Sequence, residues 1–172
     1  MKILLPVDGS QPSLEAVRHA LQLAAQGLQA SYVLVNVQEP PSIYEVMVAH
    51  DADVIDQVRG AAGTDLLQAA EALLLAAGAE YECEVAGGDP ANELVELLEN
   101  YGCDVVVMGA RGTGEPEAAG LGSVAQGLLL HSPVPVTVVR WLAPEADEID
   151  QADESDETNS SDGSADQPPA GS

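Results

Sequence analysis

Basic residues are scarce in this chain of 172 residues: one lysine and four arginines stand against 29 acidic residues. The formal charge of −24 repels nucleic acid, because binding a phosphate backbone requires a basic footprint on the protein surface. Long apolar runs are also absent, so no segment reaches the roughly 20 residues that span a membrane. Met1-Lys2 leads into the apolar Ile3-Leu4-Leu5 without a secretory leader pattern. We therefore expect a soluble, cytoplasmic protein that has neither nucleic acid nor membrane as a partner.

Aromatic residues and cysteines are few as well. Aromatic side chains make up 3% of the chain, and phenylalanine does not occur. A hydrophobic core must therefore be built from alanine, valine and leucine, which supply most of the apolar residues. The two cysteines, Cys83 and Cys103, lack the CxxC spacing of zinc ligands and redox pairs. We expect both to be small buried side chains that form no disulfide.

Lysine and arginine disappear altogether after Arg140. The residues that follow are mostly acidic or small and polar, and they carry ten of the 29 acidic residues. Such a segment cannot bury enough apolar surface to offset the entropy of ordering. We therefore expect a folded domain, residues 1–140, with a formal charge of −14, and a disordered acidic tail, residues 141–172. A solubilising extension has this composition, and so does a partner-binding or phosphorylated tail.

Residues 1–140 alternate short apolar runs with amphipathic stretches, which predicts strands alternating with helices. The expected strands are residues 3–7, 32–37, 81–85, 105–108 and 134–139, and the expected helices are residues 13–26, 54–75, 90–100 and 123–130. Ser10 is a plausible cap for the first helix, with Pro12 near its start. Gly60 and Gly63 weaken the middle of the second helix. This alternation predicts an α/β fold with a parallel sheet covered by helices on both faces.

The pattern of apolar and polar residues in each expected strand predicts the order of the strands. Continuously apolar runs are typical of central strands in a doubly covered sheet, and residues 3–7, 33–35 and 105–107 are such runs. Glu82 and Glu84 alternate with less polar residues, which is typical of an edge strand, and Pro135 marks another edge because it has no N–H. With right-handed crossovers, these constraints give an open five-stranded sheet of order 3-2-1-4-5. Ligands of such sheets bind beyond the carboxyl ends of the strands where the winding reverses, here between strands one and four.

Two loops meet at that reversal. Pro6-Val7-Asp8 leaves the first strand, and Met108-Gly109-Ala110-Arg111-Gly112 leaves the fourth. Gly122-Ser123 then opens the last expected helix, where free N–H groups and the helix dipole favour an anion. The glycines follow the spacing Gly-x2-Gly-x9-Gly, with serine next, which resembles the ATP-binding signature of the universal stress protein family. The opening ILLPVDGS, the turn Gly88-Asp89-Pro90-Ala91 and the ending SPVPVTVVR are similar to that family too, so the resemblance covers residues 1–140.

The resemblance implies a cytoplasmic regulator or nucleotide sensor in the stress response that binds ATP, with or without Mg²⁺. Asp8 would contact the nucleoside, and Val37 would line the adenine pocket beside Asn36, which stands where the family commonly has histidine. Gly109 and Gly112 would let the backbone approach the ribose and phosphates. The twelve residues expected to bind the nucleotide are Pro6, Val7, Asp8, Val37, Met108, Gly109, Arg111, Gly112, Gly122, Ser123, Val124 and Ala125.

Several features leave alternatives open. Glu115 and Glu117 oppose a triphosphate unless they face solvent or help to hold hydrated Mg²⁺, so the loop could keep the family glycines and bind nothing tightly. His19, His50 and His131 form no cluster in the sequence, and no Walker lysine, HExxH or nucleophile elbow occurs. Enzymatic activity beyond slow ATP hydrolysis is therefore not expected. The alternatives are a nucleotide-independent dimeric interaction module and, by fold analogy alone, an enzyme that adenylates or hydrolyses a nucleotide substrate.

The last expected strand, residues 134–139, is an apolar edge without lysine or glutamate to block pairing. Pairing with the same strand of a second copy around a two-fold axis would close both edges. The resemblance agrees, because many members of the family dimerise through this strand. We therefore expect a homodimer, with Trp141 as a candidate anchor residue.

Overall fold

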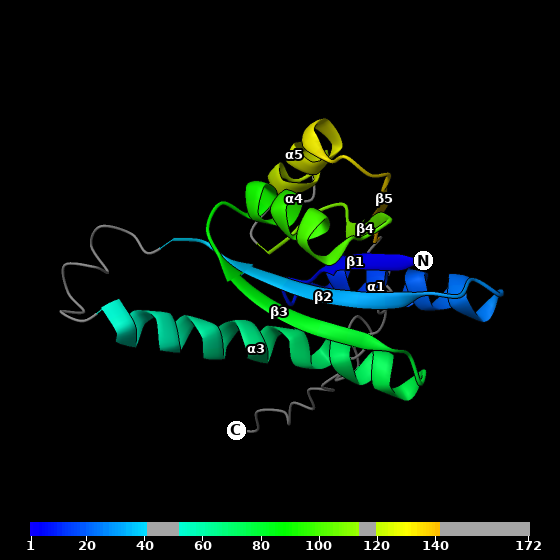
Figure 1. The fold of residues 1–172 in the computed structure, drawn as a ribbon, viewed down its shortest axis with the longest axis horizontal. Helices are drawn as coiled ribbons and strands as arrows, with labels where there is room; N and C mark the ends of the chain where they lie inside the picture. Colours follow the sequence, from blue (N-terminus) through cyan, green and yellow to red (C-terminus); the bar gives the residue numbers. More distant parts are fainter. Residues whose placement is uncertain (41–51, 114–119, 142–172) are drawn as a thin grey trace, which may run out of the picture. The chain divides into compact units, whose positions relative to one another are not determined.

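The computed structural model describes residues 1–40, 52–113 and 120–141. Its elements are β1 (Lys2–Pro6), α1 (Gln11–Ala25), β2 (Ser31–Gln38), α3 (Ala52–Ala76), β3 (Tyr81–Gly87), α4 (Pro90–Tyr101), β4 (Val105–Gly109), α5 (Ser123–His131) and β5 (Val136–Val139). The strands form one parallel sheet of order β3-β2-β1-β4-β5, which confirms the predicted fold class and strand order (Figure 1). The predictions for His50, for Glu115 and Glu117, and for the tail beyond Trp141 lie outside the described residues.

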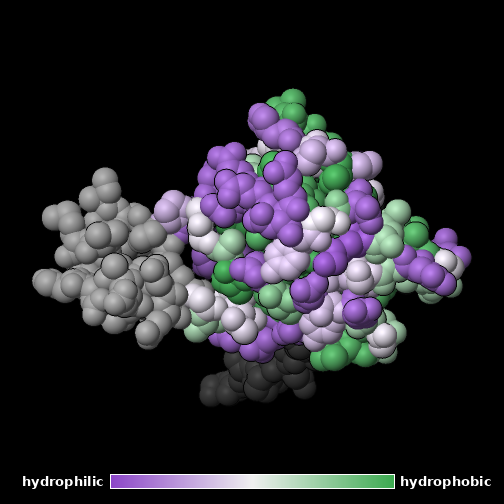
Figure 2. Space-filling model, in the orientation of Figure 1, coloured by the Kyte–Doolittle hydropathy of each residue, from purple (hydrophilic) through white to green (hydrophobic). Residues whose placement is uncertain are grey.

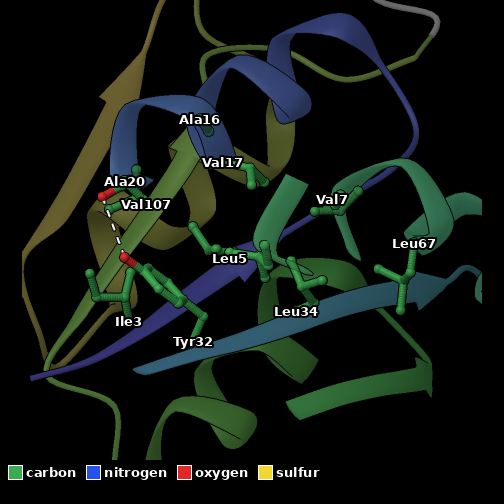
Figure 3. Packing of buried hydrophobic residues seen from close by; sticks show 12 residues of the cluster. Ile3, Leu5, Val7, Ala16, Val17, Ala20, Tyr32, Leu34, Leu67 and Val107 are labelled. Atoms are coloured by element: carbon green, nitrogen blue, oxygen red, sulfur yellow. Dashed lines mark hydrogen bonds between the residues drawn. The ribbon is translucent and has the colours of Figure 1, made fainter. Parts of the chain in front are cut away.

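Two hydrophobic clusters cover the two faces of the sheet, as the pleat of the strands requires. On one face, Ile3 and Leu5 of β1 join Tyr32 and Leu34 of β2 beneath α1 and α3 (Figure 3). Tyr32 Oη donates a hydrogen bond to Ala20 O at 3.5 Å, which the dashed line in Figure 3 marks. On the other face, the intervening residues of the same strands pack against α4 and α5. Every central strand is therefore buried on both sides.

The helix ends follow local signals in the sequence. Ser10 caps α1 as expected, because its Oγ accepts a hydrogen bond from Ser13 N at 3.3 Å. Asp89 caps α4 in the same way, with its Oδ1 3.1 Å from Asn92 N. Gly102 ends α4 in the left-handed conformation, with φ of 60°, which glycine adopts at little cost. These caps place α1 and α4 at the carboxyl ends of β1 and β3.

Gly63 has a packing role in the middle of α3. A Cβ atom at this position would lie 2.5 Å from Val85 Cγ1 and 3.0 Å from Asn36 Oδ1. The glycine that weakens the helix pattern in the sequence therefore allows α3 to lie directly against β2 and β3. Among the described residues, no helix is long and apolar enough to cross a bilayer.

The prediction that both cysteines are buried is wrong for Cys83. Cys103 is buried next to β4, whereas Cys83 is exposed on β3. The reason is that β3 is an edge strand, so no further strand covers its outer side. Cys83 Sγ donates to Glu71 Oε1 at 3.2 Å, and desolvation together with this contact raises the pKa of the thiol to about 12. Cys83 is thus a protonated thiol at neutral pH, and both cysteines are free, as expected.

Candidate functional site

A pocket of about 570 Å³ lies at the carboxyl end of the sheet. All twelve residues expected from the sequence line it, so the loops after β1 and β4, the end of β2 and the start of α5 meet at one place. Ten further described residues line the pocket without a binding role expected from the sequence, and they are Ser13, Val35, Asn36, Gln38, Glu39, Leu66, Pro90, Leu94, Ala110 and Thr113. Ala110 and Thr113 lie within the glycine-rich stretch and could have been inferred. Leu66 comes from α3, and no local pattern indicates that contact.

Gly109 ends β4 against the first turn of α1. A Cβ atom at Gly109 would lie 2.8 Å from the carbonyl carbon of Pro12 and 3.0 Å from Ser13 N. These are backbone atoms of a capped helix, and they cannot move aside as a flexible side chain can. The fold therefore requires glycine at this position whether or not a ligand approaches it.

Asp8 connects the loop after β1 to the loop after β4. Its Oδ1 accepts a hydrogen bond from Ser10 N at 3.0 Å, and its Oδ2 accepts one from Thr113 N at 2.8 Å. A Cβ atom at Gly112 would lie 2.5 Å from Asp8 Oδ2, so the second glycine of the motif makes room for this carboxylate. Asp8 thus fixes the start of the glycine-rich loop over the end of β1.

Hydrogen bonds join the two ends of the glycine-rich loop, residues 110–111 and residues 120–122. Gly122 N donates to Ala110 O at 2.9 Å, which joins the residue before α5 to the residue after β4. Arg111 Nε donates to Gly120 O at 3.0 Å and also joins the two ends of the loop. Gln126 Nε2 donates to Leu121 O at 2.6 Å from within α5. The start of α5 is therefore held in a defined position at the end of β4.

The start of α5 has the character of an anion site. Gly122 is the N-cap residue and provides no side-chain hydrogen bond to the first turn. The N–H groups of a first turn have no partner within the helix and carry the positive end of its dipole. Ser123, Val124 and Ala125 form this first turn and line the pocket. A phosphate could accept hydrogen bonds from them where a side-chain cap would otherwise stand.

The end of β2 offers a different kind of contact. In the ladder between β1 and β2, Val7 N donates to Val35 O at 2.8 Å, so the backbone groups of Val35 face β1. Backbone groups alternate in direction along a strand, and those of Val37 therefore face the same side. β1 has ended at Pro6, so the N–H and C=O of Val37 are directed toward the pocket rather than toward a strand.

Ionisable groups are few in the pocket. Among the described residues that line it, Asp8 and Glu39 are the acids and Arg111 is the base. No group of three or more histidine, cysteine, aspartate or glutamate side chains in the described part of the chain could hold a metal ion. His131 lies at the far end of α5, with its Nδ1 2.9 Å from Gly127 O.

A known protein family matches most of the chain. The sequence model of the universal stress protein family matches residues 1–140. The chain belongs to the universal stress protein family. It is 32% identical over 139 residues to the universal stress protein MJ0531 of Methanocaldococcus jannaschii, a match that covers 81% of each chain. The resemblance seen in the glycine spacing is confirmed for residues 1–140.

Solved structures of other proteins share the fold. The structure of the hypothetical protein MJ0577 superposes with a TM-score of 0.70 at 25% identity, covering 83% of this chain and 97% of that one. A universal stress protein in complex with cAMP superposes with a TM-score of 0.56 at 27% identity, covering 81% of this chain and 96% of that one. An adenine nucleotide is thus bound by a relative with this fold.

Proposed function

We propose that the chain is a cytoplasmic adenine-nucleotide-binding protein that takes ATP, alone or with Mg²⁺, into this pocket and acts as a regulator or nucleotide sensor in the stress response. One observation carries the proposal: a single pocket joins the end of β2 at Val37 to the start of α5, where the N-cap residue Gly122 has no side chain to cap the helix. The first suits a purine base, and the second suits a phosphate group. The relative that holds cAMP supports this assignment of ligand class.

The backbone N–H and C=O of Val37, at the end of β2 beyond the last residue of β1, are complementary to the hydrogen-bonding edge of adenine. Adenine presents a donor, the 6-amino group, next to an acceptor, N1. The backbone of Val37 presents the complementary pair, C=O and N–H, at the end of the ladder. Apolar side chains of Val7 and Met108 line the same pocket and suit the faces of the base.

The phosphate end of the proposed site depends on the backbone more than on charged side chains. Arg111 is the lining cation among the described residues, and its Nε is bonded to Gly120 O. The N–H groups of the first turn of α5 would supply most of the contacts to the phosphates. Turnover is not part of the proposal, because Asp8 is hydrogen-bonded to Ser10 and Thr113 and no lining histidine occurs among the described residues.

Titration calorimetry with ATP, AMP and adenosine, each with and without Mg²⁺, tests the proposed function. We expect saturable binding of ATP in a one-to-one ratio and weaker binding of adenosine, because adenosine lacks the groups that contact α5. Analysis of the nucleotide released by denaturing natively purified protein provides an independent check. Absence of binding of any adenine nucleotide by folded protein would contradict the proposal and favour the nucleotide-independent interaction module.

We also propose that two copies pair through β5. Ala110 N donates to Val139 O at 2.8 Å, so the backbone of Val139 faces β4 and that of Val138 faces outward. The edge is short and apolar. Leu129 and Leu130, at the end of the neighbouring α5, are 49% and 79% exposed, and hydrophobic surface gathers at the tip of α5 at the top of Figure 2. An edge of this kind favours pairing.

Val138→Pro should convert the dimer to a monomer. Proline removes the outward N–H at the edge and leaves the hydrogen bonds between β4 and β5 in place. Val138→Thr keeps the N–H and should remain dimeric, and deletion of residues 142–172 should not change the dimer. Light scattering of the three variants, with thermal unfolding as a check on folding, decides the matter. A folded Val138→Pro protein that is still a dimer would exclude this interface.

A further inference from the structure

Asn36 is a buried polar side chain in a row of apolar ones. It follows Tyr32 and Leu34 on the face of β2 that lies beneath α3, and it is 2% exposed. Its Nδ2 donates to Val7 O at 2.8 Å, and its Oδ1 accepts from Gln38 Nε2 at 2.5 Å. Burying an amide is costly unless it is hydrogen-bonded, so these two bonds offset the loss of water. An apolar residue would satisfy the packing alone.

The bond to Val7 O replaces a bond of the ladder. Val7 N donates to Val35 O, and the regular continuation of a parallel ladder would send Val37 N to Val7 O. That bond does not occur among the described residues, and the side chain of Asn36 donates to Val7 O instead. The N–H of Val37 is therefore directed toward the pocket without a partner in the described part of the chain.

One neighbour holds the Asn36 amide in this orientation, and another leaves room for it. Gln38 Nε2 donates to Asn36 Oδ1, so the Nδ2 end remains directed at Val7 O. Gly63 of α3 lies above the amide, and a Cβ atom there would stand 3.0 Å from Asn36 Oδ1. The amide is thus oriented by its hydrogen bonds to Val7 and Gln38, and the absence of a side chain at Gly63 of α3 leaves space beside it.

We infer that Asn36 is a positioning residue that sets the base specificity of the pocket, so that it takes 6-aminopurine nucleotides and rejects 6-oxopurine nucleotides. By donating to Val7 O, Asn36 keeps the Val37 N–H available for the N1 acceptor of a 6-aminopurine. A 6-oxopurine carries a hydrogen on N1 and an acceptor at position 6. Its N1–H would face the N–H of Val37, and its O6 would face the C=O of Val37, so neither pair could form a hydrogen bond. This inference rests on the proposed function, and it adds the side chain that makes the backbone selective.

The first test compares ATP with inosine triphosphate, which differs in the 6-oxo group and N1 hydrogen, in the full chain and in Asn36→Leu. Leucine has a similar size and fits the apolar row, but it cannot donate to Val7 O. The Val37 N–H can then form the regular ladder bond to Val7 O. We expect the full chain to bind ATP about 100-fold more tightly, since unpaired polar groups in a site strongly disfavour the wrong ligand. In Asn36→Leu the preference should fall below about tenfold, mainly through weaker ATP binding. Asn36→Ser, which keeps a hydroxyl donor in a shorter side chain, should lie between the two.

A second measurement uses the unaltered chain and does not depend on the folding of a variant. Amide hydrogen exchange followed by NMR should show that Val37 N–H exchanges at least about tenfold faster than Val35 N–H without nucleotide, because only the latter is in the ladder. ATP should slow the exchange of Val37, and inosine triphosphate should not.

Three outcomes would overturn the inference. They are equal exchange of Val37 and Val35 in the nucleotide-free protein, equal affinity of the unaltered chain for ATP and inosine triphosphate, and an unchanged preference in folded Asn36→Leu. If the chain binds ATP in any of these cases, the proposed function stands without the inference. If the chain binds no nucleotide at all, the proposed function fails and the inference fails with it.

Discussion

Gly122→Asp is expected to lower the affinity for ATP by about 100-fold or more in a protein that remains folded. Gly122 is the N-cap of α5 and has φ of −66° and ψ of 161°, a conformation open to any residue. Aspartate is a preferred N-cap, and its gain over glycine is a few tenths of a kcal/mol. Its carboxylate would accept the hydrogen bonds of the first turn and repel the phosphates.

Gly120→Asp is the matched control for Gly122→Asp. It adds the same charge two residues away, at a position where a Cβ atom would meet nothing within 4 Å. It should lower the affinity for ATP by less than about tenfold, because exposed charges interact weakly. Adenosine binding should be the same in both variants, since adenosine has no phosphate. Titration calorimetry and urea unfolding measure the two effects, and a Gly122→Asp protein that binds ATP normally would remove the start of α5 from the site.

Gly109→Ala is expected to destabilise the fold by about 2–3 kcal/mol, within the range for overpacking a rigid contact. The added methyl group would lie 2.8 Å from the carbonyl carbon of Pro12 and 2.9 Å from Pro12 O. Relief would require α1 to move away from β4 and would disturb the row of buried side chains between them. Urea unfolding measures the loss. The affinity for ATP of the protein that remains folded should also fall, because Asp8 and the start of α1 move together.

Two substitutions in the same loop provide controls for Gly109→Ala. Gly120→Ala meets no atom within 4 Å, so its stability should change by less than about 0.5 kcal/mol. Gly112→Ala meets the carboxylate of Asp8, which is the end of a side chain and can turn aside. Gly112→Ala should lower the free energy of unfolding by about 1 kcal/mol, which is the net contribution of the hydrogen bond from Thr113 N. A Gly109→Ala protein as stable as Gly120→Ala would contradict the packing role.

The strand order and the position of the pocket follow from local features of the sequence. Continuously apolar runs identify β1, β2 and β4 as central, and the alternation around Glu82 identifies β3 as an edge. The handedness of the crossovers then leaves few arrangements, and the reversal of winding places Asp8 and Gly122 in one pocket. Each of these signals depends on a short segment and on rules that hold for all chains of L-amino acids.

The reason why individual positions in the loop require glycine does not follow from the sequence. The spacing of Gly109, Gly112 and Gly122 indicates a ligand, but Gly109 contacts the backbone of Pro12 and Gly112 contacts the carboxylate of Asp8. Each of these two contacts joins segments about 100 residues apart in the chain. The sequence shows that a side chain is missing there, and only the packed structure shows which atoms occupy the space that the side chain would need.

The sequence by itself thus determined the α/β class and the order of the strands, and its resemblance to the family indicated twelve of the residues that line the pocket. The tertiary structure alone decided that Cys83 is exposed, that Leu66 of α3 reaches the pocket, and that Asn36 takes the place of a ladder bond. The physical reason is that apolar periodicity and turn chemistry act over a few residues and can be read locally. Hydrogen bonds such as that from Asn36 to Val7, and the uncovered side of an edge strand, exist only once distant segments have come together.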